Sequence, residues 1–326
     1  RNCYLDYEGK SNETEILNYK PLGFLQSIND ENQSLSNKMI FGDNYYVLKA
    51  LLPKYRNKVD LIYIDPPFGT GLNFSNIEND LAYSDKLVNS EFLEFIRKRL
   101  FLLREFMSEN GSIYLHIDKK IGHYVKIIMD EVFGYENFIN DITRIKCNPK
   151  NFSRNAYGNY SDMILFYAKN RDKNIWNEIK EPLTKEEEIE SFSKIHPVYG
   201  RYTTNPIHAP GITIDGDTGK EWKGILPPKG RHWRYSREEL TRLDDLGLIE
   251  WSENGNPRKM VFANEHKGKK VQDVWNFKDK GLSYVDYPTQ KNHDLLKRII
   301  LNSSNKDSLI MDCFAGSGST LLVANQ

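Results

Sequence analysis

An apolar run of the chain, residues 59–64, stops abruptly at an acid, two prolines and an aromatic ring, which are Asp65, Pro66, Pro67 and Phe68. Such a run is typical of a buried β-strand, and open α/β sheets bind ligands at the carboxyl ends of their strands. The prolines fix φ and remove backbone donors, which leaves carbonyl groups free to accept hydrogen bonds. A carboxylate, free carbonyls and a ring face together suit the exocyclic amino group of a flat base. An Asp-Pro-Pro sequence alone also fits an ordinary proline turn.

A second candidate site lies at the end of the chain, where a short apolar run is followed by a glycine-rich turn. Residues 309–312 are typical of a buried strand that ends at Asp312, and Gly316 and Gly318 would let a ligand approach the backbone closely. The phosphate-binding loop requires a lysine that is absent here, and the dinucleotide fingerprint requires a small residue where Leu321 stands. Two readings remain: a structural tight turn, or a site for a nucleotide-like cofactor without a pyrophosphate, such as S-adenosylmethionine (SAM).

Taken together, the two motifs resemble those of the SAM-dependent DNA amino-methyltransferases. The pair consists of Asp-Pro-Pro-Phe at 65–68 and Phe-x-Gly-x-Gly at 314–318. The catalytic motif precedes the cofactor motif, which is the permuted order of the beta class. Further segments are similar to blocks of type III modification subunits and related type II methyltransferases, namely residues 39–44, 111–118, 129–134, 233–236, 272–275 and 287–291.

The resemblance implies methyl transfer from SAM to the N6 amino group of a flipped adenine in DNA, within a restriction-modification system. Asp65 and the Pro66 carbonyl would accept hydrogen bonds from the amino group, and Phe68 would stack on the flipped base. The residues implied for catalysis are Asp65, Pro66, Pro67 and Phe68. Those implied for cofactor binding are Asp43, Asp312, Phe314, Gly316, Gly318, Thr289 and Lys291.

Other substrates, and a role without catalysis, also fit the sequence. The methylated group could be N4 of cytosine, or an amine in RNA or protein. Asp rather than Ser at position 65 favours adenine N6, and Asp rather than Asn disfavours methylation of glutamine. An alternative of another class is a catalytically inactive DNA-binding subunit, against which the intact motif at 65–68 argues.

The pattern from residue 37 to 170 alternates strands and helices, which indicates a mostly parallel sheet with covering helices. The expected strands are 38–41, 59–64, 111–117 and 162–170, and the expected helices are 44–52, 90–108 and 119–133. The fold class is therefore α/β, and the resemblance implies a Rossmann-like SAM-dependent methyltransferase sheet, circularly permuted, with an inserted target-recognition domain. The predicted domains are a loosely packed N-terminal arm (1–36), a catalytic half (37–170), a target-recognition domain (171–283) and a SAM-binding half that is incomplete at its C-terminus (284–326).

Residues 171–283 are irregular in pattern and rich in aromatic and basic side chains. A helix is expected at 236–246, where Ser236 and Glu239 would form a capping box, and a hairpin is expected at 248–262 around a glycine turn. Basic residues here could contact phosphates and base edges of DNA, although an ordinary surface of mixed charge is the alternative. The DNA-binding candidates, including those of the basic loop 144–154, are Lys146, Lys150, Arg154, Arg231, Arg234, Arg258, Lys259, Lys267 and Lys269.

Composition sets limits on the other possibilities. The formal net charge is +0, so a nucleic-acid surface has to come from local clusters of basic residues. Three scattered cysteines fit a reducing compartment, and no Cys/His group has zinc-ligand spacing, so we expect no metal. The absence of a signal peptide and of a long apolar run predicts a cytoplasmic protein. Expected partners are double-stranded DNA, a restriction subunit and a second copy in a homodimer, and the first and last residues lead us to expect a piece of a longer protein.

Overall fold

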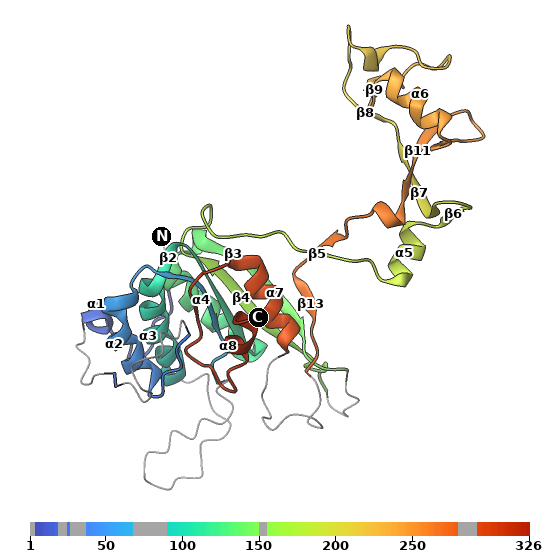
Figure 1. The fold of residues 1–326 in the computed structure, drawn as a ribbon. Helices are drawn as coiled ribbons and strands as arrows, with labels where there is room; N and C mark the ends of the chain where they lie inside the picture. The colour runs from blue at the N-terminus through green and yellow to red at the C-terminus, as the bar shows by residue number, and fades with distance from the viewer. Residues whose placement is uncertain (1–3, 19–24, 27–36, 68–89, 150–154, 280–291) are drawn as a thin grey trace. The chain divides into compact units, whose positions relative to one another are not determined.

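The computed structural model describes residues 4–18, 25–26, 37–67, 90–149, 155–279 and 292–326 of the chain (Figure 1). These residues belong to two compact units. The first unit combines residues 1–179 with residues 272–326, and the second is formed by residues 180–271. The second unit therefore interrupts the first in sequence, and it lies within the range 171–283 for which a separate domain is predicted.

A six-stranded mixed sheet forms the centre of the first unit. Its strands, in spatial order, are β13 (Val274–Asn276), β3 (Phe138–Ile145), β4 (Ser161–Ala168), β2 (Met107–Ile117), β1 (Val59–Ile64) and β14 (Ile310–Met311). β4 is antiparallel to both of its neighbours, and the remaining pairs are parallel. The carboxyl ends of the other five strands therefore lie together with the first residues of β4, at what we call the carboxyl edge of the sheet.

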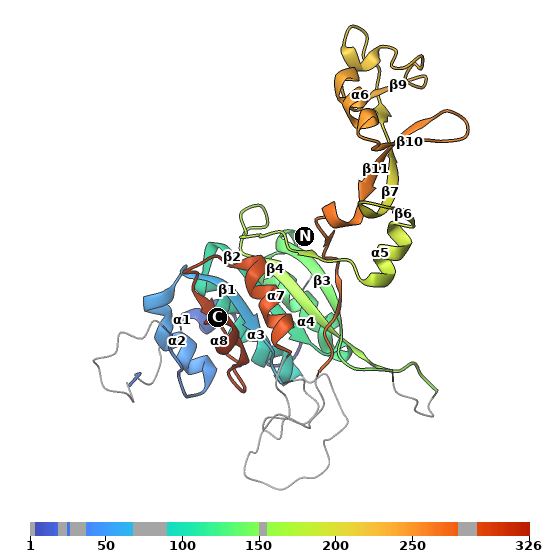
Figure 2. The ribbon, with the colours of Figure 1, turned by 45° about the vertical axis from the view of Figure 1, so that its right-hand side comes forward.

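Helices cover both faces of this sheet (Figure 2). The helices of the first unit are α1 (Glu13–Asn18), α2 (Asn44–Tyr55), α3 (Ser90–Phe106), α4 (Lys119–Phe133), α7 (His293–Ser303) and α8 (Ser319–Ala324), with a 3-10 turn at Tyr135–Asn137. Side chains alternate along a strand, so Ile113 and Leu115 of β2 pack into the core beside α3 and α4. Tyr114 points to the other face, where its hydroxyl lies 2.8 Å from the hydroxyl of Ser303 on α7.

Most of the predicted elements are confirmed, as is the α/β fold class. Strands 59–64, 111–117 and 162–170 and helices 44–52, 90–108 and 119–133 are all present, with bounds that differ by a few residues. The predicted strand 38–41 is wrong, because this segment pairs with no strand of the described chain; Met39 and Phe41 are exposed by 74% and 97%. None of the helices in the described ranges combines the length and the apolar character that crossing a bilayer requires.

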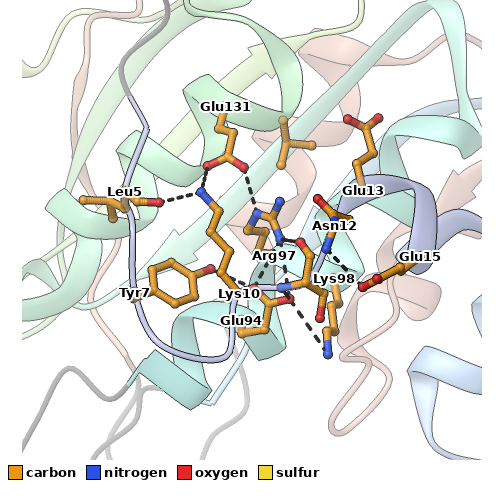
Figure 3. Close-up of polar contacts among 12 residues, drawn as sticks. Leu5, Tyr7, Lys10, Asn12, Glu13, Glu15, Glu94, Arg97, Lys98 and Glu131 are labelled. Carbon is orange, nitrogen blue, oxygen red and sulfur yellow. Dashed lines mark hydrogen bonds and ion pairs between the residues drawn. The ribbon is translucent and has the colours of Figure 1, made fainter.

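Residues 5–13 of the N-terminal arm pack more tightly than predicted, because a network of charged groups holds them against α3 and α4 (Figure 3). Arg97 of α3 donates to Glu131 of α4 at 2.9 Å and lies 3.2 Å from Glu94. From the arm, Tyr7 donates to Glu94 at 2.8 Å and Lys10 pairs with Glu131 at 2.9 Å. Each carboxylate therefore binds the arm and a helix at the same time.

The second unit consists of small antiparallel sheets and two short helices around a tryptophan core. One sheet has the order β10 (Ile249–Trp251), β11 (Pro257–Phe262), β7 (Gly200–Pro206) and β6 (Lys194–His196); β5 (Lys180–Glu181) pairs with β12 (Lys269–Lys270), and β8 (His208–Pro210) with β9 (Arg231–Trp233). The helices are α5 (Lys185–Ser191) and α6 (Arg237–Asp245), with 3-10 turns at Asp217–Gly219 and Ala263–Glu265. The Trp222 ring stacks at 5.5 Å on Trp251 and meets Trp233 edge-on at 6.4 Å.

The predicted helix and hairpin of this unit are both present. Ser236 caps α6 by accepting the backbone N–H of Glu239 at 3.2 Å. The capping box is only half formed, because the Glu239 carboxylate binds Arg242 at 2.7 Å instead of returning to the cap. β10 and β11 form the hairpin, and Gly255 in its turn has a φ of 74°, which favours glycine.

Replacing Arg97 tests how much the charge network stabilises the first unit. Arg97→Ala should lower the free energy of unfolding by about 3 kcal/mol, because it leaves two largely buried carboxylates without their best cation. Lys98→Ala is the matched control on the same helix: its ammonium is 34% exposed and 3.8 Å from Glu94, so the change should stay below about 1 kcal/mol. Urea unfolding measures both, and equal losses would contradict this account.

Candidate functional site

Asp65 and Asp312 lie at the ends of neighbouring parallel strands. β1 and β14 pair with Ile62 opposite Met311, so both acids follow their strands onto the carboxyl edge. The Asp65 side chain is 21% exposed, and of the next two residues Pro66 is buried and Pro67 is exposed. The structure therefore brings the first three predicted catalytic residues beside the predicted cofactor motif, while Phe68 lies outside the described residues.

The Asp312 carboxylate is buried and hydrogen-bonded within its own turn. It accepts the backbone N–H of Phe314 at 2.8 Å and the hydroxyl of Thr320 at 2.6 Å. Burial raises the pKa of Asp312 to about 6; these two hydrogen bonds oppose the rise, and the negative charge of Asp65 adds to it. Asp312 therefore changes its charge near neutral pH, and Asp65 is close enough to influence that change.

The glycine turn after β14 has the backbone conformation that its sequence predicts. Gly316 and Gly318 have φ values of 52° and 77°, in the left-handed region that favours glycine. The ring of Phe314 lies 6.1 Å from that of Phe95 on α3. Three of the predicted cofactor residues are thus held by backbone geometry and by packing on α3.

Asp43 has a structural contact of its own at the start of α2. Its carboxylate accepts the backbone N–H of Tyr45 at 2.9 Å and lies 3.7 Å from the Arg99 guanidinium. Its side chain is nevertheless 55% exposed. The next residue, Asn44, donates to the Cys313 carbonyl at 2.8 Å and so ties the start of α2 to the glycine turn.

A cavity of about 480 Å³ lies along β14. Its walls come from residues 37–42, from α2 and from residues 308–313. Asp312 lines the cavity, and so do both chain neighbours of Asp43. The glycine turn contributes Ala315. The segment mistaken for a strand in the sequence therefore forms a wall of this cavity, which opens beside two of the predicted cofactor residues.

A row of polar side chains crosses the carboxyl edge of the sheet, and the sequence analysis missed most of it. The row runs from Asp65 after β1 through His116 of β2 and Asp162 of β4 to Arg144 and Lys146 of the β3 end. His116 lies between two carboxylates, with Nδ1 3.7 Å from Asp65 Oδ1 and Nε2 3.2 Å from Asp162 Oδ2. The sequence contains one signal for this row, because His116 interrupts the apolar run 113–117 near the end of β2.

The basic loop 144–154 contributes differently from its prediction. Lys146 is a member of the buried row: its ammonium lies 2.6 Å from Asp162 and 3.6 Å from Asp118. Its charge is therefore already balanced inside the protein, unlike that of a free DNA-contacting cation. The remaining predicted site residues of the first unit and its connections lie outside the described residues, namely Lys150, Arg154, Thr289 and Lys291.

Three predicted DNA-binding residues of the second unit meet around His208; we call Arg231, Arg234 and Arg258 the arginine group. Arg231 lies 3.2 Å from the His208 ring, and Arg234 donates to the His208 carbonyl at 3.1 Å. Arg258 donates to the Thr204 hydroxyl at 2.8 Å. Partial burial lowers the pKa of His208, and the charges of all three arginines lower it further. Within the described ranges, no carboxylate forms an ion pair with the arginine group.

The other basic candidates of the second unit lie apart from the arginine group or have partners of their own. Lys259 lies over the ring of Tyr235 at 4.8 Å. Lys269 forms an ion pair with Glu187. Lys267 is exposed. Of these three lysines, Lys267 is the one best placed to meet a phosphate without first breaking a contact that the structure shows.

Comparison with known proteins identifies relatives over almost the whole chain. Residues 59–326 match the DNA methylase family. The chain is 42% identical to the type II methyltransferase M.EcaI of Enterobacter cloacae, over 98% of this chain and 72% of that protein. It is 30% identical to the Mod subunit of the type III restriction-modification enzyme StyLTI of Salmonella typhimurium, over 89% of this chain but 50% of that protein. The solved M1.HpyAVI–SAM complex aligns with 87% of this chain and 86% of its own, at 16% identity and a TM-score of 0.41.

The raised pKa of Asp312 predicts how stability depends on pH. A carboxyl group whose folded pKa lies above its unfolded value favours folding in its protonated form, so this contribution is present below about pH 4 and is lost as pH rises through about 6. Asp312→Asn removes the ionisation. Thermal unfolding of the two proteins without cofactor at pH 5 and pH 8 should show the wild type losing stability relative to the variant at pH 8. A constant difference between them would contradict the assignment.

Proposed function

The chain belongs to the DNA methylase family, and we propose that it transfers a methyl group from SAM to the N6 amino group of an adenine in double-stranded DNA. The observation that carries the proposal is the position of the Asp65 carboxylate and the Pro66 backbone at the carboxyl end of β1, beside the end of β14. A carboxylate and a carbonyl are the two acceptors that the two hydrogens of an amino group require.

The proposed chemistry is positioning and electrostatic activation of a weak nucleophile. The lone pair of the adenine amine is delocalised into the ring. Hydrogen bonds from its hydrogens to Asp65 and to the Pro66 carbonyl would hold the nitrogen pyramidal and return electron density to the lone pair. The base has to leave the helix to reach these acceptors. SAM, when bound, supplies an electrophilic methyl group, and the protein contributes the in-line placement of the amine.

The residues after β14 fit a cofactor of this kind. Asp312 offers a buried acceptor, and the left-handed Gly316 and Gly318 leave the backbone uncovered. Phe314 is held in the same turn, and Asp43 presents a half-exposed carboxylate next to the cavity along β14. We propose that these five residues hold SAM, and that Phe68, Thr289 and Lys291 act as the resemblance implies.

We further propose that the second unit reads the DNA sequence through its arginine group. Two of its guanidinium groups are held by backbone carbonyls, since Arg234 binds the His208 carbonyl and Arg258 the Thr204 carbonyl. A guanidinium that is fixed in this way and forms no ion pair within the described residues can meet the paired acceptors of a guanine edge. Lys267 would instead contact phosphates, which adds affinity without sequence preference.

The relatives support a proposal about a partner, and the DNA substrate supports one about the place of action. Because a similar protein is the Mod subunit of a restriction-modification enzyme, we propose a restriction subunit as a partner of this chain. The chain spans half of that relative's length. Since the substrate is DNA, we expect the enzyme to act in the cytoplasm. A homodimer remains a hypothesis, which sedimentation of the protein with and without DNA would test.

Asp65→Ala tests the proposed catalytic role. The variant should lose at least about 10²–10³-fold in the rate of methyl transfer, because one of two hydrogen bonds to the amine is gone, while folding and DNA binding persist. Asp60→Asn is the matched control at the other end of β1; it alters a hydrogen bond to Ser108 at 2.7 Å and should retain activity. Sequencing that separates N6-methyladenine from N4-methylcytosine in treated plasmid gives the readout. An active Asp65→Ala variant, or methylation of cytosine, would overturn the proposal.

Variants of the basic residues test whether the second unit reads sequence. Arg234→Ala or Arg258→Ala should relax the preference at one position of the site, at a cost of about 1–3 kcal/mol in discrimination. Lys267→Ala should weaken binding to every sequence alike. It should also reduce the slope of the logarithm of the binding constant against the logarithm of salt concentration by about one. Arg242→Ala is the control, because its guanidinium is already paired with Glu239. Methylation of a library with randomised sites is the assay, and unchanged preference in both arginine variants would contradict the assignment.

A further inference from the structure

His116 lies beside Asp65, the carboxylate proposed to bind the amine. Its side chain is fully buried, and its two ring nitrogens face carboxylates on opposite sides, Asp65 at 3.7 Å and Asp162 at 3.2 Å. The Tyr63 hydroxyl lies 3.1 Å from the same ring nitrogen that faces Asp65. A buried imidazole with this many polar neighbours has one defined orientation, so the ring cannot turn away from Asp65 without losing hydrogen bonds.

Asp162 provides a fixed anion behind the imidazole. Its side chain is 2% exposed, and besides His116 it contacts Lys146 at 2.6 Å and Arg144 at 3.6 Å. Burial alone would raise the pKa of Asp162, but the hydrogen bonds from His116 and Lys146 outweigh burial and lower it to about 2. Asp162 therefore stays ionised and accepts a hydrogen bond from Nε2 of His116, which fixes the proton on that nitrogen.

Asp65 also lies near a second acid, Asp312, whose negative charge a protonated His116 would offset. Asp312 is close enough for the charge of Asp65 to raise its pKa. Burial raises the pKa of Tyr63 well above its ordinary value, and the charges of Asp65 and Asp312 raise it further, so Tyr63 stays a neutral phenol. The amine requires an ionised acceptor oxygen on Asp65, and a positive charge on the side of His116 favours that form.

We propose that His116 is a positioning residue for methyl transfer: anchored on Asp162, it directs positive charge at Asp65 and so keeps that carboxylate ionised and oriented as a hydrogen-bond acceptor. In this arrangement Nε2–H donates to Asp162, and Nδ1–H faces Tyr63 and Asp65. The inference rests on the proposed role of Asp65 in binding the amine. It adds to that role two residues from neighbouring strands, His116 of β2 and Asp162 of β4, which act on Asp65 without touching the base.

The charged and titratable groups around this site come from every strand that borders it. They are Tyr63 and Asp65 of the β1 end, Asp118 after β2, Arg144 and Lys146 of the β3 end, Asp162 of β4, Asp279 after β13 and Asp312 after β14. The cations Arg144 and Lys146 lie on the far side of Asp162, so their charge is balanced there. Among the described members of the row, His116 is the one whose ring nitrogen lies within 4 Å of the Asp65 carboxylate.

His116→Asn tests the proposal, because the amide keeps polar character but cannot carry the positive charge. The variant should bind DNA and SAM as the wild type does, yet kcat should fall about 10²-fold, as expected when a reacting group loses its orientation. The acid limb of the pH profile of kcat should move to higher pH, because Asp65 would take up a proton more readily. Asp162→Asn should also lower kcat, because His116 loses its anchor, and it provides a second variant if His116→Asn does not fold.

Tyr114→Phe is the matched control for a merely structural role. It removes a buried hydrogen bond, to Ser303 at 2.8 Å, from the same face of the same strand. It should lower thermal stability without moving kcat or its pH profile. If folded His116→Asn and Asp162→Asn kept the wild-type kcat and pH profile while Asp65→Ala was inactive, this inference alone would be wrong. If Asp65→Ala was itself active, the proposed function would fail first.

Discussion

The parallel pairing of β1 with β14 is the interaction on which the rest of the site depends. It joins strands from opposite ends of the chain, and the backbone N–H of Asp60 extends it by donating to the Leu309 carbonyl at 2.9 Å. Parallel neighbours end at the same edge of a sheet, so an acceptor group and a glycine turn that are distant in sequence meet there. The order of the two motifs along the chain is therefore irrelevant to the site, provided that both strands enter the sheet side by side.

Bringing these strand ends together concentrates carboxylates in a poorly solvated region, which is unfavourable unless each acid has a partner suited to it. The structure supplies a different solution for each. Asp162 has cations and remains ionised, whereas Asp312 has a hydroxyl and a backbone N–H and titrates at a pKa of about 6. Asp65 lies 3.7 Å from Nδ1 of His116, whose positive charge would compensate its own. Different environments thus shift the pKa values of Asp162 and Asp312 in opposite directions along one edge.

The sequence predicted those features whose signal is local, and it failed where the outcome depends on register. The apolar periodicity of residues 90–108 and 119–133 defines α3 and α4, and the motif residues mark the two strand ends. Residues 38–41 have the composition of a strand, but a strand requires a partner, and none of the described segments pairs with them. The pairing of Lys146 with Asp162 was also missed, because it depends on the antiparallel register of β3 and β4. Such pairings join distant residues and leave no pattern in either segment alone.

The distribution of cations reconciles a net charge of +0 with a DNA substrate. In the first unit, basic side chains such as Arg97, Arg144 and Lys146 are bound to acids of the interior or of neighbouring helices, so they stabilise the fold and add little external field. In the second unit, no carboxylate of the described residues forms an ion pair with the arginine group, although Glu250 lies opposite Arg258 in the hairpin. Burial and the charges of the three arginines lower the pKa of His208. Repulsion between like charges is unfavourable in the free protein and is relieved by an anion. Binding of DNA at the arginine group would therefore be favoured electrostatically, whereas Arg97, Arg144 and Lys146 of the first unit already have acidic partners.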